Sequence, residues 1–163
     1  MVAMNDELRN FNLALAEIQG LYHEACVRLG VSDSACQVLY TVAMFGDGCS
    51  TPRDVYRSFG VSRQTVHSAV SVLERRGILF LQKGPGRERR MRLTESGRAL
   101  VREKIAPLIS LENALLGGWS EEDRRALLRL LRKYRDDLRS RLAALKPRTE
   151  ASRPASRRAE PGQ

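Results

Sequence analysis

Two short helical segments joined by a two-residue link are the feature that most limits how this chain folds. Thr51 is an N-cap, Pro52 suits the first helical position and an acidic residue stands three residues after the cap, which predicts a helix to Phe59. Ser62 caps a second helix, and only residues 60–61, Gly and Val, separate it from the first. Two helices joined by such a tight turn form a helix-turn-helix.

A short basic hairpin follows the second helix. After Gly77, residues 78–81 form an apolar strand, residues 84–86 (Gly-Pro-Gly) are a strong turn, and residues 89–93 alternate as a returning strand does. A helix-turn-helix with such a hairpin is a winged helix, in which the second helix of the pair enters the major groove of DNA and the hairpin reaches the flanking minor groove.

Longer helices flank this unit on both sides. Apolar side chains at helical spacing predict a helix over about residues 6–29, and a run that is apolar on nearly every side predicts a buried helix over residues 33–45. After the hairpin, Thr94 caps a helix that we expect to kink at Pro107. A last helix over residues 120–145 carries a narrow apolar stripe with a spacing near 3.5 residues, as in helices that pack lengthwise on others.

The full chain has a net charge of +9, and the positive charge is concentrated in its middle part. Residues 53–104 hold thirteen basic and five acidic side chains, whereas residues 1–52 hold two basic and six acidic ones. A basic centre between milder flanks indicates a surface that binds a polyanion, most often nucleic acid. The alternative is an ordinary solvated charged face, and charge alone favours neither.

Three runs of the sequence resemble the MarR family of bacterial transcriptional regulators: residues 60–66 (GVSRQTV), residues 73–79 (LERRGIL) and residues 93–97 (LTESG). Counting helix order, the resemblance covers about Asp6 to Leu145. It implies an obligate homodimer held by its first and last helices. It also implies binding to near-palindromic operators in double-stranded DNA, and release when a small molecule or an oxidant acts.

The predicted fold class is mainly α: a winged helix-turn-helix with a small β-hairpin wing and a helical dimerisation region. We assign residues 1–146 to one MarR-like winged-helix domain. Within it, the DNA-binding part covers about residues 32–96, and the dimerisation helices cover about residues 6–29 and 94–145. Residues 147–163 are rich in Pro, Ala, Ser, Arg and Glu without periodicity, so we expect a disordered basic tail.

The predicted wing departs from the family pattern. Family wings commonly carry Asp-x-Arg near the tip, and matching backward from Thr94 places Pro85 at the acidic position and Arg87 at the arginine position. The arginine at the tip of the wing therefore lacks the acidic residue that would orient it in the family pattern. Either Arg87 or Arg89 is the candidate for the minor groove.

The second helix of the predicted helix-turn-helix has a polar face. At 100° per residue, the apolar residues from Val66 to Leu73 point inward, and Gln64 and Arg75 lie opposite them. Glutamine can pair with adenine through two hydrogen bonds, and serines suit base edges or phosphates. A solvated face is the alternative, but the neighbouring wing favours DNA contact. The candidate DNA-binding residues are Arg63, Gln64, Thr65, His67, Ser68, Ser71 and Arg75 on the helix, and Lys83, Arg87, Arg89 and Arg90 on the wing.

Other patterns argue against a metal site, a cofactor and catalysis. Three cysteines without CxxC spacing and two histidines fit neither a disulfide framework nor a zinc site. The chain has no glycine-rich phosphate loop and no Cys/His or Ser/His signature, so an enzyme is the least supported class and we expect no cofactor. No apolar stretch is long enough to span a bilayer and no export signal is visible, which favours the cytoplasm.

The cysteines and four aromatic residues allow two interpretations each. Cys26 and Cys36 lie on apolar helix faces, which favours buried packing over redox sensing, and Cys49 is the more exposed candidate for a sensor. The four aromatic residues are expected to line an effector pocket or, as is more common for such residues, to form part of the core. These residues are Tyr22, Tyr40, Phe45 and Trp119.

These observations predict a sequence-specific DNA-binding transcriptional regulator, a homodimeric repressor whose operator binding is relieved by a small molecule or oxidant. The alternative function is a winged-helix module for protein–protein interaction without a specific operator. That alternative predicts a less basic wing than the one in this sequence.

Overall fold

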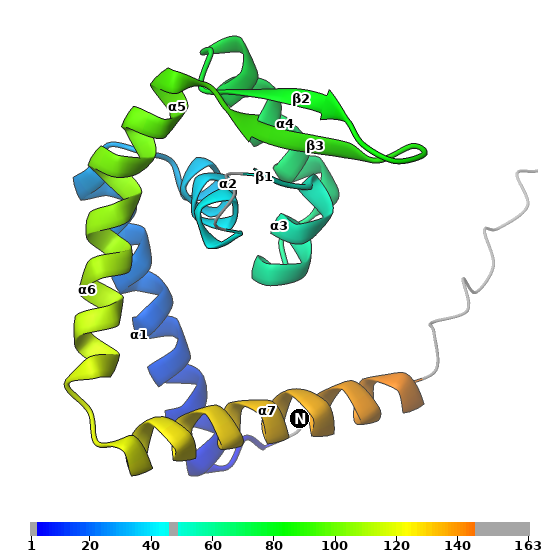
Figure 1. Ribbon diagram of the computed structural model, residues 1–163. Coiled ribbons are helices and arrows are strands. Elements are labelled where there is room, and N and C mark those ends of the chain that lie inside the picture. Colours follow the sequence, from blue (N-terminus) through cyan, green and yellow to red (C-terminus); the bar gives the residue numbers. More distant parts are fainter. Residues whose placement is uncertain (1–2, 46–48, 146–163) are drawn as a thin grey trace, which may run out of the picture. The chain divides into compact units, whose positions relative to one another are not determined.

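The computed structural model describes residues 3–45 and 49–145 (Figure 1). The chain divides into two compact units, Met1–Leu115 and Leu116–Gln163, each of which is described by itself. The elements are, in chain order, α1 (Asp6–Leu29), α2 (Asp33–Met44), β1 (Cys49–Ser50), α3 (Pro52–Phe59), α4 (Arg63–Arg75), β2 (Leu79–Lys83), β3 (Arg89–Leu93), α5 (Glu95–Leu100), the π-helical segment η1 (Val101–Ile105), α6 (Ala106–Gly117) and α7 (Glu121–Ala144). The predicted disordered tail, residues 147–163, lies outside the described residues.

The helix-turn-helix forms as its caps predict. The backbone N–H of Thr51 donates to Asp54 Oδ2 at 2.8 Å and the N–H of Asp54 donates to Thr51 Oγ1 at 3.3 Å, a reciprocal capping box at the start of α3. Gly60 ends α3 in the left-handed conformation at φ 66°. The hydroxyl of Ser62 then accepts from the N–H of Thr65 at 3.0 Å and starts α4. The chain therefore turns between α3 and α4 with its exposed backbone groups satisfied.

The wing is an antiparallel hairpin in which Leu79 pairs with Leu93 and Lys83 with Arg89. The first strand was expected at residues 78–81, and the structure corrects it to Leu79–Lys83. Ile78 precedes the strand because its backbone N–H still donates to the carbonyl of Leu73, at the end of α4, at 2.9 Å. A third strand, β1, pairs with the other edge of β3. The sequence did not predict β1, because two residues are too short to show an alternating pattern.

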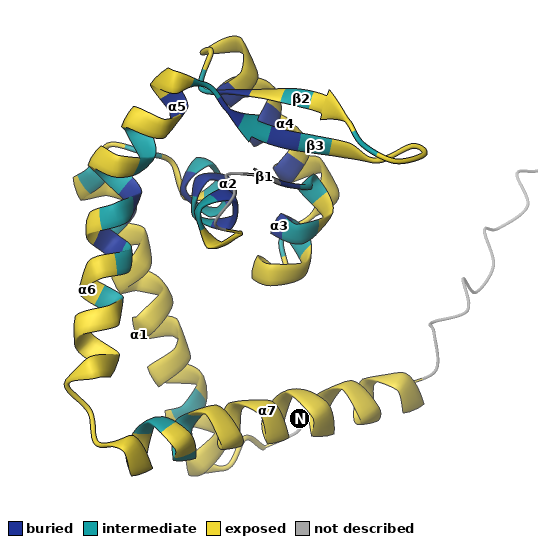
Figure 2. Ribbon diagram, viewed as in Figure 1, coloured by how far each residue is buried: buried dark blue, intermediate teal, exposed yellow. Residues whose placement is uncertain are grey.

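The core surrounds α2, as its apolar character predicted. Val38, Leu39 and Val42 of α2 have no exposed surface. They belong to one cluster that also takes in Val55 of α3, the inner face of α4, both hairpin strands and Ile105 of η1. Figure 2 shows this burial as dark segments on α2, α4 and β3. Each such side chain removed from water stabilises the fold by about 1.5–3 kcal/mol, so the wing and α4 rest on a common apolar base.

The helix after the wing is interrupted in the turn before Pro107, the residue at which the sequence predicted a kink. Pro107 has no N–H and its ring conflicts with the carbonyl four residues earlier. The interruption takes the form of η1, in which the N–H of Ala106 bonds to the carbonyl of Val101, five residues back. The widened turn coincides with a fully buried side chain, Ile105. The predicted single helix is thus α5, η1 and α6.

The two longest helices leave most of their apolar side chains exposed. In α1 the buried residue is Cys26, and no described residue of α7 is buried (Figure 2). The exposed apolar residues include Leu8, Leu15 and Ile18 of α1, and Leu131, Tyr134, Leu138 and Leu142 of α7. Monomeric proteins rarely expose apolar surface on this scale, so we expect these helix faces to pack against another protein surface. None of the described helices is both long and apolar enough to cross a membrane.

Candidate nucleic-acid interface

Helix α4 separates an apolar face from a polar one. Its buried residues are Val66, Ala69, Val70 and Leu73, each at most 7% exposed. The structure places Gln64, Ser68, Ser71 and Arg75 on the exposed side, as the helical spacing predicted. Because packing holds the apolar face against α2 and α3, the polar face is presented by a rigid support.

The first five residues of α4 carry the remaining helix candidates, and two of them have local partners. The guanidinium of Arg63 lies 5.4 Å from the centre of the Tyr56 ring, a cation–π arrangement that fixes its direction. The hydroxyl of Thr65 lies 2.8 Å from that of Ser62, within the N-cap. Arg63 is thus exposed but held against Tyr56, His67 is exposed, and the hydroxyl of Thr65 is shared with the cap.

The wing carries the other candidates. Lys83, Arg87 and Arg89 are exposed, and Arg90 is partly buried. The wing is tied to α4, because the backbone N–H of Leu81 donates to Glu74 Oε1 at 3.3 Å. The polar face of α4 and the basic hairpin thus belong to one packed unit (Figure 1).

The wing contains an acidic residue that pairs with an arginine, a pair that the sequence analysis did not predict. Arg90 Nε donates to Glu88 Oε2 at 3.1 Å. A β-carbon at Gly84 would lie 3.0 Å from Glu88 Oε2 and 3.2 Å from Arg90 Nε, so the pair occupies the space that this glycine leaves. The acidic position was expected at Pro85, three residues earlier. The Glu88-x-Arg90 spacing was visible in the sequence, and it makes Arg90, rather than Arg87 or Arg89, the arginine with a carboxylate partner.

A cavity of about 620 Å³ lies between α1, α2, α3 and α6. The hydroxyls of Tyr22 and Tyr40 both donate to the carboxylate of Glu112, each at 2.6 Å. The hydrogen bond to Glu112 is the main reason that the pKa of Tyr22 rises to about 12, and burial followed by the same contact raises the pKa of Tyr40. Both hydroxyls therefore stay protonated donors at neutral pH. Tyr22 and Tyr40, two of the four aromatic residues considered for an effector pocket, thus line one cavity, and Phe45 is not among its lining residues.

Two of the cysteines line the same cavity. Cys26 and Cys36 are each 5% exposed and their thiols are hydrogen-bonded to one another. Burial is the largest cause that raises both thiol pKa values, that of Cys36 to about 12. A protonated buried thiol is a poor nucleophile, so their chemistry agrees with the predicted packing role. The side chain of Cys49 lies outside the described part of the chain.

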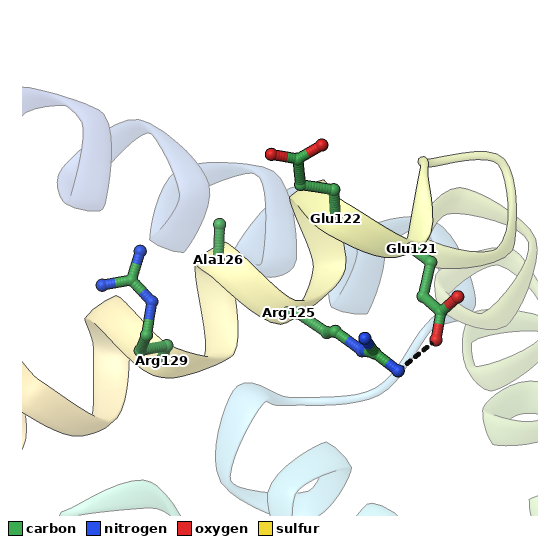
Figure 3. Close-up of a pocket in the computed structure, with 5 residues that line it drawn as sticks. All are labelled: Glu121, Glu122, Arg125, Ala126 and Arg129. Carbon is green, nitrogen blue, oxygen red and sulfur yellow. Dashed lines mark ion pairs between the residues drawn. The ribbon is translucent and has the colours of Figure 1, made fainter.

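A second hollow of about 420 Å³ lies along α7 (Figure 3). It is lined by Ala126 and by four charged residues of that helix, among which Arg125 pairs with Glu121 at 2.5 Å. Because the lining comes from one exposed helix and its charges are of both signs, it has neither the enclosure nor the apolar walls of a small-molecule site.

The comparisons with known proteins agree on one family. The model of the MarR family matches residues 29–90. No curated protein matches the chain. Among solved structures, NMB1585, a MarR family regulator from Neisseria meningitidis, is 19% identical, with a TM-score of 0.76 over 86% of this chain and 99% of that one.

Two further solved structures are similar over most of their length. A MarR/EmrR family transcriptional regulator from Acinetobacter is 16% identical, with a TM-score of 0.67 over 84% of this chain and 99% of that one. MepR from S. aureus is 20% identical, with a TM-score of 0.63 over 82% and 96%. At these identities the solved structures establish the shared fold.

The fold and the polar face beside the wing define a winged helix-turn-helix of the DNA-binding class. The match to the MarR family model goes one step further, because it covers residues 29–90, which include both helices of the helix-turn-helix and most of the wing. The resemblance stated from the sequence is therefore confirmed over residues 29–90, and the family match supports the prediction of a DNA-binding transcriptional regulator. The alternative, a protein-interaction module, is not favoured.

Proposed function

We propose that this protein is a homodimeric transcriptional repressor that binds a near-palindromic operator in double-stranded DNA and releases it when a small molecule binds. The observation that carries the proposal is the exposed polar face of α4, tied to a basic wing by the contact between Glu74 and Leu81. Structures of MepR and of Sco3205 from Streptomyces coelicolor contain DNA. BpsR from Bordetella bronchiseptica is described as regulated in its DNA binding by 6-hydroxynicotinic acid. These relatives support the proposal.

The roles of the site residues follow from their places on the helix and the wing. Gln64, in the first turn of α4, reads base edges together with Ser68 and Ser71, because the first turn of a recognition helix lies deepest in the groove. Arg75, three turns later, contacts the backbone. Arg63, Thr65 and His67 line the flank, and Lys83, Arg87, Arg89 and Arg90 bind around the adjacent minor groove.

The domain division is part of the same proposal. Residues 32–96 bind DNA, and the helices over residues 6–29 and 94–145 dimerise through their exposed apolar faces. The protein has no catalytic role and acts in the cytoplasm. Support for the non-catalytic role comes from the family, whose matching members are regulators.

The proposal is tested by selecting bound duplexes from a random pool and then comparing Gln64→Ala with Arg75→Ala on single-base variants of the selected site. Gln64→Ala is expected to cost about 1–3 kcal/mol on the preferred site and to relax preference at one base pair per half-site, because its amide can satisfy two groups of one adenine. Arg75→Ala is expected to weaken all sequences alike.

The half-sites are expected to lie about 10 base pairs apart, since a two-fold dimer presents both recognition helices to one side of the duplex. A pool that returns no enriched sequence contradicts the proposed operator. A uniform loss of affinity in Gln64→Ala, with base preferences retained, contradicts its role as reader.

Sedimentation tests the dimer. Twice the 18.3 kDa of one chain is expected, because one small winged helix cannot cover the apolar faces of α1 and α7. Leu138→Asp, on the stripe of α7, is expected to weaken the dimer by at least about 100-fold, since burying an unpaired carboxylate costs several kcal/mol. Arg139→Asp, the next residue and off the stripe, is the matched control. A parent protein that is monomeric at micromolar concentration contradicts the proposal.

A further inference from the structure

The cavity between α1, α2, α3 and α6 has an unusual balance of charge. Two carboxylates, Asp33 and Glu112, line it, and its described lining contains no lysine or arginine. Asp33 is paired with His23, whose Nδ1 lies 2.9 Å from a carboxylate oxygen, and both side chains are more than half exposed. Glu112 differs, because its hydrogen-bond partners in the described part are two neutral hydroxyls. A carboxylate held by neutral donors lacks a counter-ion.

The walls around Glu112 suit an organic cation rather than a metal ion. Tyr22 and Tyr40 hold its two oxygens, and the ring of Phe59 meets that of Tyr40 edge to face at 6.1 Å between centroids. Aromatic rings attract cations through their negative faces. The described residues contain no group of three or more His, Cys, Asp or Glu arranged to hold a metal ion. A volume of about 620 Å³ is that of a typical small-molecule site.

We propose that this cavity binds a protonated amine, whose ammonium group pairs with Glu112 and whose aromatic or aliphatic body packs against Tyr40 and Phe59. An ammonium group supplies both the positive charge and the N–H donors that the carboxylate accepts. A ligand carboxylate would instead meet Glu112 and Asp33 as like charges.

Occupation of the cavity has a structural consequence. Tyr22 belongs to α1, Tyr40 to α2 and Glu112 to α6, so the two hydrogen bonds to Glu112 join these three helices. An ammonium group that takes over the oxygens of Glu112 displaces the hydroxyls and loosens α2 from α6. Because α2 packs directly on α3 and α4, the amine then biases the position of the recognition helix. This regulatory step rests on the proposed function, whereas the binding itself does not.

Calorimetry on the full chain without DNA tests the site. The probes are 2-phenylethylammonium and, as its anionic counterpart of similar size, 3-phenylpropanoate at pH 7. The amine is expected to bind, and the carboxylate is not. Glu112→Gln is expected to weaken amine binding by at least about 10-fold, because it removes the charge and keeps the shape. Glu24→Gln, on the exposed part of α1 outside the cavity, is the matched control and is expected to bind as the parent does.

A second variant separates the site from general damage to the fold. Tyr40→Phe removes a hydroxyl that competes for Glu112, so it is expected to bind the amine several-fold more tightly, the opposite sign to Glu112→Gln. Equal binding of both probes, or unchanged binding in Glu112→Gln, overturns the proposal. Amine binding that leaves the affinity for the selected operator unchanged upholds the cation site and overturns its regulatory step. Failure to select any operator, with amine binding intact, counts against the proposed function alone.

Discussion

Replacing Gly97 with alanine is expected to destabilise the protein by about 3 kcal/mol and to lower its unfolding temperature by roughly 6–12 °C. A β-carbon at this position would lie 1.9 Å from the carbonyl oxygen of Ile78, a backbone atom that side-chain rotation cannot move. Either α5 or the base of the wing has to shift. Because Leu93 and Ile78 are parts of that base, the loss extends to the core beneath the wing.

The close approach follows from the cap that joins α5 to the end of α4. Thr94 donates its hydroxyl to the carbonyl of Gly77 at 2.6 Å, and accepts from the N–H of Gly97 at 3.0 Å. The first turn of α5 is thereby drawn onto the segment that starts the hairpin. The LTESG run of the sequence is therefore explained as a packing requirement, with threonine as the cap and glycine where the backbones meet.

Gly20→Ala is the matched control for this measurement. Gly20 lies within α1 and nothing stands within 4 Å of an added β-carbon, so alanine is expected to stabilise the helix by about 0.5–1 kcal/mol. Thermal unfolding at one protein concentration measures both variants, because dimerisation makes the midpoint depend on concentration. Equal midpoints for Gly97→Ala and the parent would show that the 1.9 Å contact is relieved without cost.

Replacing Arg87 and Arg89 together with alanine is expected to weaken operator binding by roughly 1,000-fold at about 0.15 M salt. Each phosphate contact releases counterions and contributes about 0.9 to the slope of log K against log salt, so the loss of two contacts from each wing of the dimer flattens the slope by about 3.6 units. Titration of the operator at several salt concentrations gives both quantities. An unchanged slope of log K against log salt would show that the tip of the wing does not contact the phosphates of the operator.

Glu88 and Arg90 allow a sharper test of the same wing. Arg90→Ala is expected to reduce preference for the selected site more than affinity for unrelated DNA, because the carboxylate of Glu88 directs this guanidinium. Glu88→Gln removes a negative charge and the orienting partner together. It is therefore expected to strengthen binding to unrelated DNA while reducing the ratio of specific to non-specific affinity. A parallel change in both affinities would mean that the pair does not orient Arg90 on DNA.

Those features that depend on neighbours in the chain could be predicted from the sequence. Thr51 and Ser62 cap their helices within three residues, Gly60 adopts the left-handed turn that ends α3, and the apolar positions from Val66 to Leu73 face inward because helical geometry fixes their directions. These interactions are local, so the pattern of residue types carries them. They sufficed for the winged helix and for the exposed face of α4.

Contacts between distant segments were decided by the tertiary structure. Strand β1 exists because its two residues meet β3 about forty positions away, and the tyrosine contacts to Glu112 span 90 and 72 residues. No periodicity records such meetings, since they depend on how whole helices pack. The pair of Glu88 and Arg90 is close in sequence, but its place over Gly84 follows from the hairpin register. The sequence by itself thus determined the helices, the wing and the polar face of α4. The tertiary structure decided that Glu88 and Arg90 meet over Gly84 and that two tyrosines and a glutamate line one cavity, because both depend on backbone positions that contacts between distant segments set.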